Sequence, residues 1–454
     1  MVDLHWKSNI VGSDMPTKLS PASATIPRVM SLPPLTAPFQ AADISASSSP
    51  ACSAYDHYLR LPQLRKLWSA SDFPDWKSEP IFKPALHALE ITFRLLSTVL
   101  LDPRPYVNRR QWLRRIESLA VAEIETISSL CEDDEDDPDT SGTAPTADLS
   151  KSEGVSYSEA SLLPRLATWY KSKDVAQRIL HTVESQMRRC PYTLGLGEMN
   201  IAGKPSLLYD AVCKPSEIHS LNKAPNDDVI ESCENQTVYT THQIIESWIH
   251  VAHQLLGRIT ERIRSKKFDK AAEDCYMVER IWKLLADIEE LHLLMDPDDF
   301  LRLKSQLSIR STGETTAFCF RSKELVEVTN LCKDLKHKVP EILEVEVDPK
   351  GGPRIQEAAM KLYVDKNEKG GFEKVQLLQA MQGIESAMKR FFFTYKQVLV
   401  VVMGSSEASG NRVGTRSESG DSLSQIYLEP TYFPSLDAAK TFLGYFWDNE
   451  HRCY

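Results

Sequence analysis

Three histidines and one glutamate recur at helical spacing near the middle of the chain. They are His242, Glu246, His250 and His253. At about 100° per residue, His242, Glu246 and His253 fall within about 40° of one another around a helix, and His250 lies a little further round. Imidazole and carboxylate groups one turn apart are ligands for zinc or iron. A single helix supplies too few well-angled ligands, so we predict no metal here. The alternative is a metal site formed by these four residues, which would need a further ligand from another helix.

The element that positions these side chains is a long helix, predicted from about Tyr239 to Lys266. Its apolar residues recur every three to four positions and predict a buried stripe. The stripe consists of Ile245, Trp248, Ala252, Leu255, Ile259 and Ile263. Polar groups beside such a stripe point either into a pocket or into water, and which of the two holds decides the function.

The start of this helix follows the pattern T-H-Q-x-x-E-x-W through Thr241, His242, Gln243, Glu246 and Trp248. It resembles the distal-histidine helix of the tryptophan dioxygenase family. The resemblance implies a helical bundle around a central cavity, with His242, Glu246 and Trp248 at a ligand pocket. His242 would face the indole N–H of a substrate. The alternative is a histidine that is hydrogen-bonded near a helix start.

Further matches follow in the order found in that family. They are Arg280 to Leu285, Leu294 to Phe300, Phe320-Arg321, Gly414-Thr415 with Gly420, and Tyr427-Leu428. The resemblance implies that Arg321 holds a substrate carboxylate through its planar guanidinium. It also implies that Thr415 bonds a ligand's amino or carboxyl group. The alternatives are a buried ion pair between Arg321 and Glu246 or another acid, and an ordinary turn residue at Thr415.

The haem ligand of that family is missing from this chain. The dioxygenases hold haem iron through a histidine on the helix before a glycine-rich loop. Tyr395 stands at that position, and no histidine occurs between His337 and His451. We therefore predict no cofactor and no catalytic activity, with Tyr395 lining a vestigial pocket. The alternative is a haem- or metal-dependent oxygenase that acts on an indole with a non-histidine axial ligand.

Three longer blocks are similar to the plant nematode-resistance-like HSPRO family. They are Met1 to Leu4, Met187 to Glu198 and Leu428 to Lys440. The resemblance spans nearly the whole chain. It implies a non-catalytic regulator of basal defence and stress signalling that binds the βγ-type regulatory subunit of the plant sucrose-nonfermenting-related kinase. We predict a small indolic or amino-acid-like molecule as a second ligand, and self-association into a homo-oligomer stays open.

Composition and charge limit which class of protein this can be and where in the cell it is expected. The 454 residues are 42% hydrophobic and 26% charged, which is typical of a soluble globular protein. The formal net charge of -10 argues against a nucleic-acid-binding surface, which needs a basic face. The longest apolar run, Val398 to Met403, is far shorter than the roughly 20 residues that span a bilayer. Nine cysteines without a Cys-x-x-Cys pattern indicate reduced thiols in the cell. The predicted location is cytoplasmic, with the nucleus and the plastid left open.

Composition also divides the chain into four predicted parts. Residues 1–50, rich in Pro, Ser and Ala, form a disordered tail, and residues 51–131 form an N-terminal helical region. Residues 132–153 begin with an acidic run and form a flexible linker. Residues 154–454 form the helical domain that resembles tryptophan dioxygenase. Apart from a brief alternation at 343–347, little in the chain predicts a strand, so the predicted fold class is all-α.

Apolar spacing predicts further helices in the second half of the chain. Their approximate ranges are 268–294, 325–343, 355–363, 372–403 and 436–447. Pro340 is predicted to end the second of them, because proline lacks the amide hydrogen that continues a helix.

Overall fold

The computed structural model describes most of the chain in twelve stretches. They are residues 55–70, 79–102, 108–131, 161–190, 193–196, 207, 209–222, 233–297, 322–346, 354–364, 370–403 and 426–450. The predicted tail of residues 1–50 and the predicted linker of residues 132–153 lie outside the described residues.

Helices make up nearly all of the described structure, which confirms the all-α prediction. The α-helices are α2 (Leu61–Ser69), α3 (Glu79–Leu101), α4 (Arg109–Leu130), α5 (Leu162–Leu166), α6 (Lys173–Gln186), α7 (Tyr209–Cys213), α8 (Pro215–Leu221), α9 (Cys233–Arg264), α10 (Phe268–Glu289), α12 (Lys323–Asp334), α13 (Val339–Leu343), α14 (Arg354–Val364), α15 (Gly371–Met403) and α17 (Pro434–Glu450). The 3-10 helices are η3 (Met187–Arg189), η4 (Glu290–Leu294) and η5 (Leu335–Lys338).

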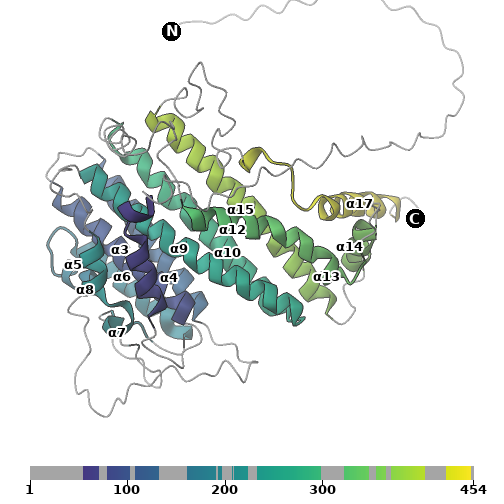
Figure 1. The fold of residues 1–454 in the computed structure, drawn as a ribbon, viewed down its shortest axis with the longest axis horizontal. Coiled ribbons are helices and arrows are strands. Elements are labelled where there is room, and N and C mark those ends of the chain that lie inside the picture. The colour runs from purple at the N-terminus through teal and green to yellow at the C-terminus, as the bar shows by residue number, and fades with distance from the viewer. Residues whose placement is uncertain are drawn as a thin grey trace, which may run out of the picture. The chain divides into compact units, whose positions relative to one another are not determined.

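The long helices pack side by side around α9 and α10 (Figure 1). Helix α10 packs against α9 and α15, and α3 packs against α9 and α4. Their buried residues belong to one hydrophobic core, which extends along the sequence from Tyr55 to Ala439. The predicted N-terminal region and the predicted C-terminal domain therefore share a single core.

A left-handed turn joins α9 to α10 and sets their relative register. Lys266 has φ 58°, a conformation that reverses the chain at a helix end. The amides of Lys266 and Lys267 donate to the carbonyls of Ile263 and Arg262, each at 2.9 Å. The two helices then run back along each other. The opening turns of α9 therefore lie beside the last turns of α10 and η4.

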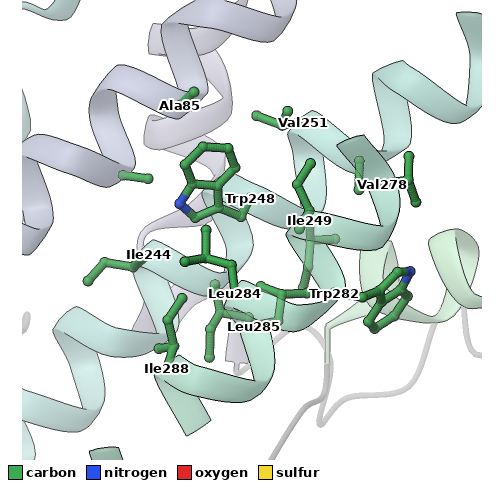
Figure 2. Packing of buried hydrophobic residues seen from close by; sticks show 14 of the residues in the cluster. Ala85, Ile244, Trp248, Ile249, Val251, Val278, Trp282, Leu284, Leu285 and Ile288 are labelled. Atoms are coloured by element: carbon green, nitrogen blue, oxygen red, sulfur yellow. The ribbon is translucent and has the colours of Figure 1, made fainter. Parts of the chain in front are cut away.

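Trp248 fills the space between three helices, as Figure 2 shows. Its ring is fully buried among Ala85 of α3, Ile244 of α9, and Leu284 and Leu285 of α10. Burying a large aromatic ring stabilises the packed helices by about 2–3 kcal/mol. The apolar stripe predicted on α9 is thus the side that holds the bundle together.

The prediction of a single helix over residues 325–343 is wrong. The chain instead forms α12, the 3-10 helix η5 and then α13. Pro340 lies in the first turn of α13, where its missing amide hydrogen has no helical partner to lose. Leu343 ends α13, and Glu344 follows with φ 56°. Residues 344–346 form no strand, so the alternation noted there does not produce one.

A buried carboxylate anchors three later segments to α3. Glu90 is 0% exposed and accepts hydrogen bonds from the hydroxyls of Ser161 and Tyr209, both at 2.9 Å, and from the Leu162 amide at 2.9 Å. The Nε2 atom of His219 lies 2.8 Å from Glu90 Oε1. Because its oxygens are engaged by donors from the fold itself, we assign Glu90 a structural role.

One helix of the described part is long and apolar enough to cross a membrane. It is Pro80–Leu101 of α3. An 18-residue stretch of this helix has a mean hydropathy of 1.3, and 83% of that stretch is buried inside the protein. The core helix of a soluble protein meets the same criterion, so this single helix is weak support for a membrane span.

Candidate functional site

A group of buried polar side chains lies where α9, the last turn of α10, η4 and the start of α12 meet. We call it the polar cluster. It consists of Tyr55, Thr241, His242, Glu246, Glu289, His292 and Ser322. Every member is 8% exposed or less. Because these groups are removed from water, each needs a partner inside the protein.

His292 joins α9 to the end of α10. Its Nε2 atom lies 2.8 Å from the hydroxyl oxygen of Thr241, and its Nδ1 atom lies 3.3 Å from Glu289 Oε2. Glu289 ends α10 and His292 lies in η4, so their spacing of three residues puts both on one side of the turn. The Thr241 hydroxyl is also 2.9 Å from the carbonyl oxygen of Thr237.

The His242 ring lies near the rings of two other cluster members. Its centroid is 5.6 Å from that of His292 and 6.0 Å from that of Tyr55. Burial, together with the neighbouring His292, holds the pKa of His242 well below its usual range. His242 is therefore a neutral imidazole at physiological pH, with one ring nitrogen carrying a lone pair.

Glu246 has both carboxyl oxygens engaged. The Tyr55 hydroxyl donates to Oε1 at 3.0 Å, and the Ser322 hydroxyl donates to Oε2 at 2.9 Å. Ser322 also accepts a hydrogen bond from the Leu325 amide and so caps α12. Burial raises the pKa of Glu246 to about 8, although the two hydrogen bonds favour the carboxylate. Its partners come from elements that are far apart in the sequence.

The alternative metal set of His242, Glu246, His250 and His253 is divided between two groups of partners. His250 Nδ1 lies 2.6 Å from Glu324 Oε1, and His253 Nδ1 lies 3.3 Å from the same oxygen. The rings of His250 and Trp68 stack with centroids 4.7 Å apart. Within the described residues, the ligand atoms that do lie within 4.8 Å of one another belong to His242, Glu289 and His292.

Trp248 lies on a different side of α9 from His242. Six residues separate the two, which turns the side chain by about 240° around the helix. The Trp248 indole N–H donates to Glu123 Oε1 at 2.9 Å. Burial raises the pKa of Glu123 to about 8, although hydrogen bonds from Trp248 and Thr92 favour the carboxylate. Trp248 thus joins α9 to α4 through the core.

The other predicted site residues are distributed as follows. Tyr395 lies on α15 within the hydrophobic core and is 1% exposed. Arg321 and Thr415 lie outside the described residues. Whether all of these converge with His242 on one ligand pocket stays a prediction.

Sequence reasoning missed five members of the polar cluster, and one of these, Thr241, was noted only as part of the pattern at the start of the helix. Glu289 and His292 form a Glu-x-x-His pattern, a spacing that places metal ligands on one helix face in some helical bundles. That pattern could have been found. Tyr55 and Ser322 carry no such signal, because they reach Glu246 across 191 and 76 positions of the chain.

Taken together, the fold and the polar cluster define a predominantly helical protein whose long helices enclose a buried group of histidines and carboxylates. Comparison with known proteins then gives its family. A family model described as the Hs1pro-1 N-terminus matches residues 1–184, and one described as the Hs1pro-1 protein C-terminus matches residues 187–449. The chain belongs to the Hs1pro-1 family.

Two relatives from Arabidopsis thaliana match over nearly the whole chain. Nematode resistance protein-like HSPRO2 is 54% identical over 452 residues, which cover 99% of this chain and 100% of the relative. Nematode resistance protein-like HSPRO1 is 55% identical over 423 residues, which cover 93% of this chain and 95% of the relative. These matches confirm the HSPRO resemblance. No solved structure matches the chain significantly, and the tryptophan dioxygenase-like fold stays a prediction.

Proposed function

We propose that this protein is a non-catalytic regulator of plant basal defence and stress signalling that acts by binding another protein. The role is supported by the two relatives, both named as nematode resistance protein-like and both similar over nearly the full chain. The proposed partner is the βγ-type regulatory subunit of the sucrose-nonfermenting-related kinase, which the HSPRO resemblance implies.

The observation that best supports action by protein binding is a group of apolar side chains at the protein surface. Phe393 on α15 is 48% exposed, and its ring packs edge-on against that of Tyr427 with centroids 5.5 Å apart. Leu428, beside Tyr427, is 69% exposed. We call Phe393, Tyr427 and Leu428 the α15 surface. Adjoining exposed aromatic and aliphatic groups of this kind mark protein-binding sites.

A direct binding measurement tests this proposal. The purified chain is titrated with the purified kinase regulatory subunit by calorimetry, and the double variant Phe393→Asp/Leu428→Asp is compared with Tyr170→Asp. Tyr170 is 98% exposed on another part of the protein, so it is a control for a new surface charge. We expect the double variant to bind at least about 30-fold more weakly, the loss of a hot-spot contact of about 2 kcal/mol. Absence of binding by the wild type would overturn the proposal.

The proposal also includes the absence of haem catalysis. Tyr395 replaces the histidine at the proposed axial position, and its buried place in the core is what we expect of a packing residue. The purified chain is incubated with hemin and the Soret band is recorded. We expect free hemin only. A sharp band that shifts with carbon monoxide would instead support the rival function, an oxygenase with a non-histidine axial ligand.

A small indolic or amino-acid-like ligand is the remaining part of the proposal. Support comes from the buried polar groups of α9, where His242 is a neutral imidazole beside an aromatic ring. Thermal unfolding is measured with increasing concentrations of indole and tryptophan. A Tm that rises with ligand concentration indicates binding to the native state, and a constant Tm would remove ligand sensing from the proposed function.

A further inference from the structure

We propose that His242, Glu289 and His292 bind a divalent transition-metal ion inside the helical bundle. This goes beyond the proposed function, which includes no metal. Each of the three residues is 2% exposed, and each offers a ligand atom that lies within 4.8 Å of the other two. Two imidazoles and one carboxylate are the protein ligands of several zinc sites and of many non-haem iron sites.

The three ligands come from rigid elements. His242 is in the third turn of α9, Glu289 is the last residue of α10, and His292 is in η4. The turn at Lys266 makes α9 and α10 antiparallel neighbours, so the opening of one helix faces the end of the other. A site built from two packed helices requires little rearrangement when an ion enters.

The hydrogen bonding of Glu289 supports the metal site independently of the distances between the three ligand atoms. Its Oε1 atom is buried and has no hydrogen-bond partner among the described residues, while Oε2 faces His292 at 3.3 Å. Buried carboxylate oxygens are nearly always paired with a donor or a cation, because an unpaired one loses its hydration without compensation. A metal ion held by the carboxylate and the two imidazoles supplies a cation to this incompletely paired carboxylate.

Thr241 is in position to orient His292 as a ligand. A threonine within a helix commonly donates to the carbonyl four residues earlier, and the Thr241 hydroxyl lies 2.9 Å from the Thr237 carbonyl oxygen. The hydroxyl oxygen then accepts a hydrogen bond from His292 Nε2–H at 2.8 Å. This leaves the lone pair on Nδ1, which points toward Glu289. Metal-binding histidines commonly donate their other ring N–H to such an oxygen.

The third ligand, His242, is also removed from solvent, at 2% exposed. Three protein ligands leave a coordination position for water or a small molecule, as in catalytic zinc sites.

The competing explanation is an internal hydrogen-bond network without metal. In it, Thr241 donates to His292 Nε2, and His292 Nδ1–H donates to Glu289 Oε2. A doubly protonated His292 paired with Glu289 is the other metal-free form. Both forms place a hydrogen on Nδ1, whereas the metal site requires a lone pair there.

Zinc binding to the full-length chain tests the proposal. The metal-free protein is loaded with Zn²⁺, dialysed, and measured for metal content by mass spectrometry. Histidine ring nitrogens are followed by ¹⁵N NMR. We expect one Zn²⁺ per chain, a Tm that rises with Zn²⁺ concentration, and a His292 ring without hydrogen on Nδ1. A wild type that retains no Zn²⁺, or whose His292 Nδ1 stays protonated in excess Zn²⁺, overturns the proposal.

Variants separate this site from adventitious binding to cysteines or acidic segments. Glu289→Gln keeps the size of the side chain and should abolish the retained zinc, as should His292→Asn. Thr241→Val keeps all three ligands and should weaken binding about 10- to 100-fold. His253→Asn changes a histidine of the same helix that pairs with Glu324, and it should bind zinc as the wild type does. Zinc retained equally by Glu289→Gln and the wild type shows adventitious binding and overturns the assignment.

Discussion

The Tyr55 hydroxyl donates a hydrogen bond of 3.0 Å to Glu246 Oε1, across 191 positions of the chain. Tyr55 precedes α2, and Glu246 lies in the middle of the bundle on α9. The second oxygen of Glu246 accepts a hydrogen bond from Ser322 at the start of α12. One carboxyl group therefore joins three segments that are far apart in the sequence. We expect its surroundings to affect the stability of the folded protein and the dependence of that stability on pH.

Replacing Tyr55 with phenylalanine should destabilise the protein by about 1–3 kcal/mol. The ring and its packing against His242 are kept, but Glu246 Oε1 loses its donor while it stays buried. The measurement is the free energy of unfolding from denaturant titration. Tyr170→Phe removes the same hydroxyl from a side chain that is 98% exposed, and it should change stability by less than about 0.5 kcal/mol. Equal effects of the two variants would contradict the structural role of Tyr55.

Glu246 should make the protein less stable as the pH rises from about 4.5 to about 8. Its pKa is raised from 4.5 to about 8 on folding, chiefly by burial and also by Glu324, while Ser322, Tyr55 and Arg65 act in the opposite direction. The folded state therefore keeps a proton that the unfolded chain releases. The stabilisation is fully present below the unfolded pKa and is lost as the pH rises through the folded pKa, by up to about 1.4 kcal/mol per pH unit.

The variant Glu246→Gln isolates this contribution, because the amide does not titrate. We expect the stability difference between wild type and variant to shift steadily across that pH window in denaturant titrations. Glu123→Gln is the matched comparison, since the pKa of Glu123 is also raised to about 8 by burial and it lies in another part of the core. A difference that stays constant from pH 5 to pH 8 would contradict the raised pKa of Glu246.

The sequence predicted those parts of the structure that depend on local spacing. The helical repeat located α9, α10 and α15, although α9 begins at Cys233, earlier than the predicted Tyr239. It failed at α12 and α13, because a proline can begin a helix as well as end one. For the site, the α9 side of the polar cluster was predicted through His242 and Glu246. Their partners were not, because contacts between distant segments leave no periodic pattern.

Glu324 should stabilise the protein at neutral pH and lose that contribution in acid. Burial alone would raise the pKa of Glu324, but hydrogen bonds from His250 and His253 and the nearby Arg65 hold it at about 2. The carboxylate is thus favoured by folding. Its stabilisation is present above the unfolded pKa of 4.5 and is lost as the pH falls toward 2.

Glu324→Gln should cost about 2–3 kcal/mol at pH 7 and much less near pH 2.5, as judged by denaturant unfolding. Glu327→Gln is the control on the same helix, because the Glu327 side chain is 47% exposed and pairs with Lys323 at 3.8 Å. That exposed pair should contribute less than about 1 kcal/mol. An undiminished cost of Glu324→Gln at low pH would show that its carboxylate charge does not cause the stabilisation.

Two glycines inside long helices should respond differently to alanine. Gly257 of α9 has nothing within 4 Å of the position that a Cβ atom would take, so Gly257→Ala should stabilise the protein by about 1 kcal/mol. At Gly383 of α15 the new Cβ would lie 2.6 Å from Glu279 Oε2. Glu279 pairs with Lys283 at 2.7 Å, four residues along α10.

The Glu279 carboxylate is the end of a flexible side chain, and it can move away from the Gly383→Ala methyl group. The movement gives up the ion pair with Lys283, which is worth about 0.3–0.5 kcal/mol on a helix surface. The gain from Gly383→Ala should therefore be about half of that from Gly257→Ala. In the Lys283→Ala background the ion pair is already absent, and the two alanine substitutions should stabilise more nearly equally. A net loss of stability from Gly383→Ala in that background, measured by denaturant titration, would mean that α10 and α15 pack too closely for any side chain there.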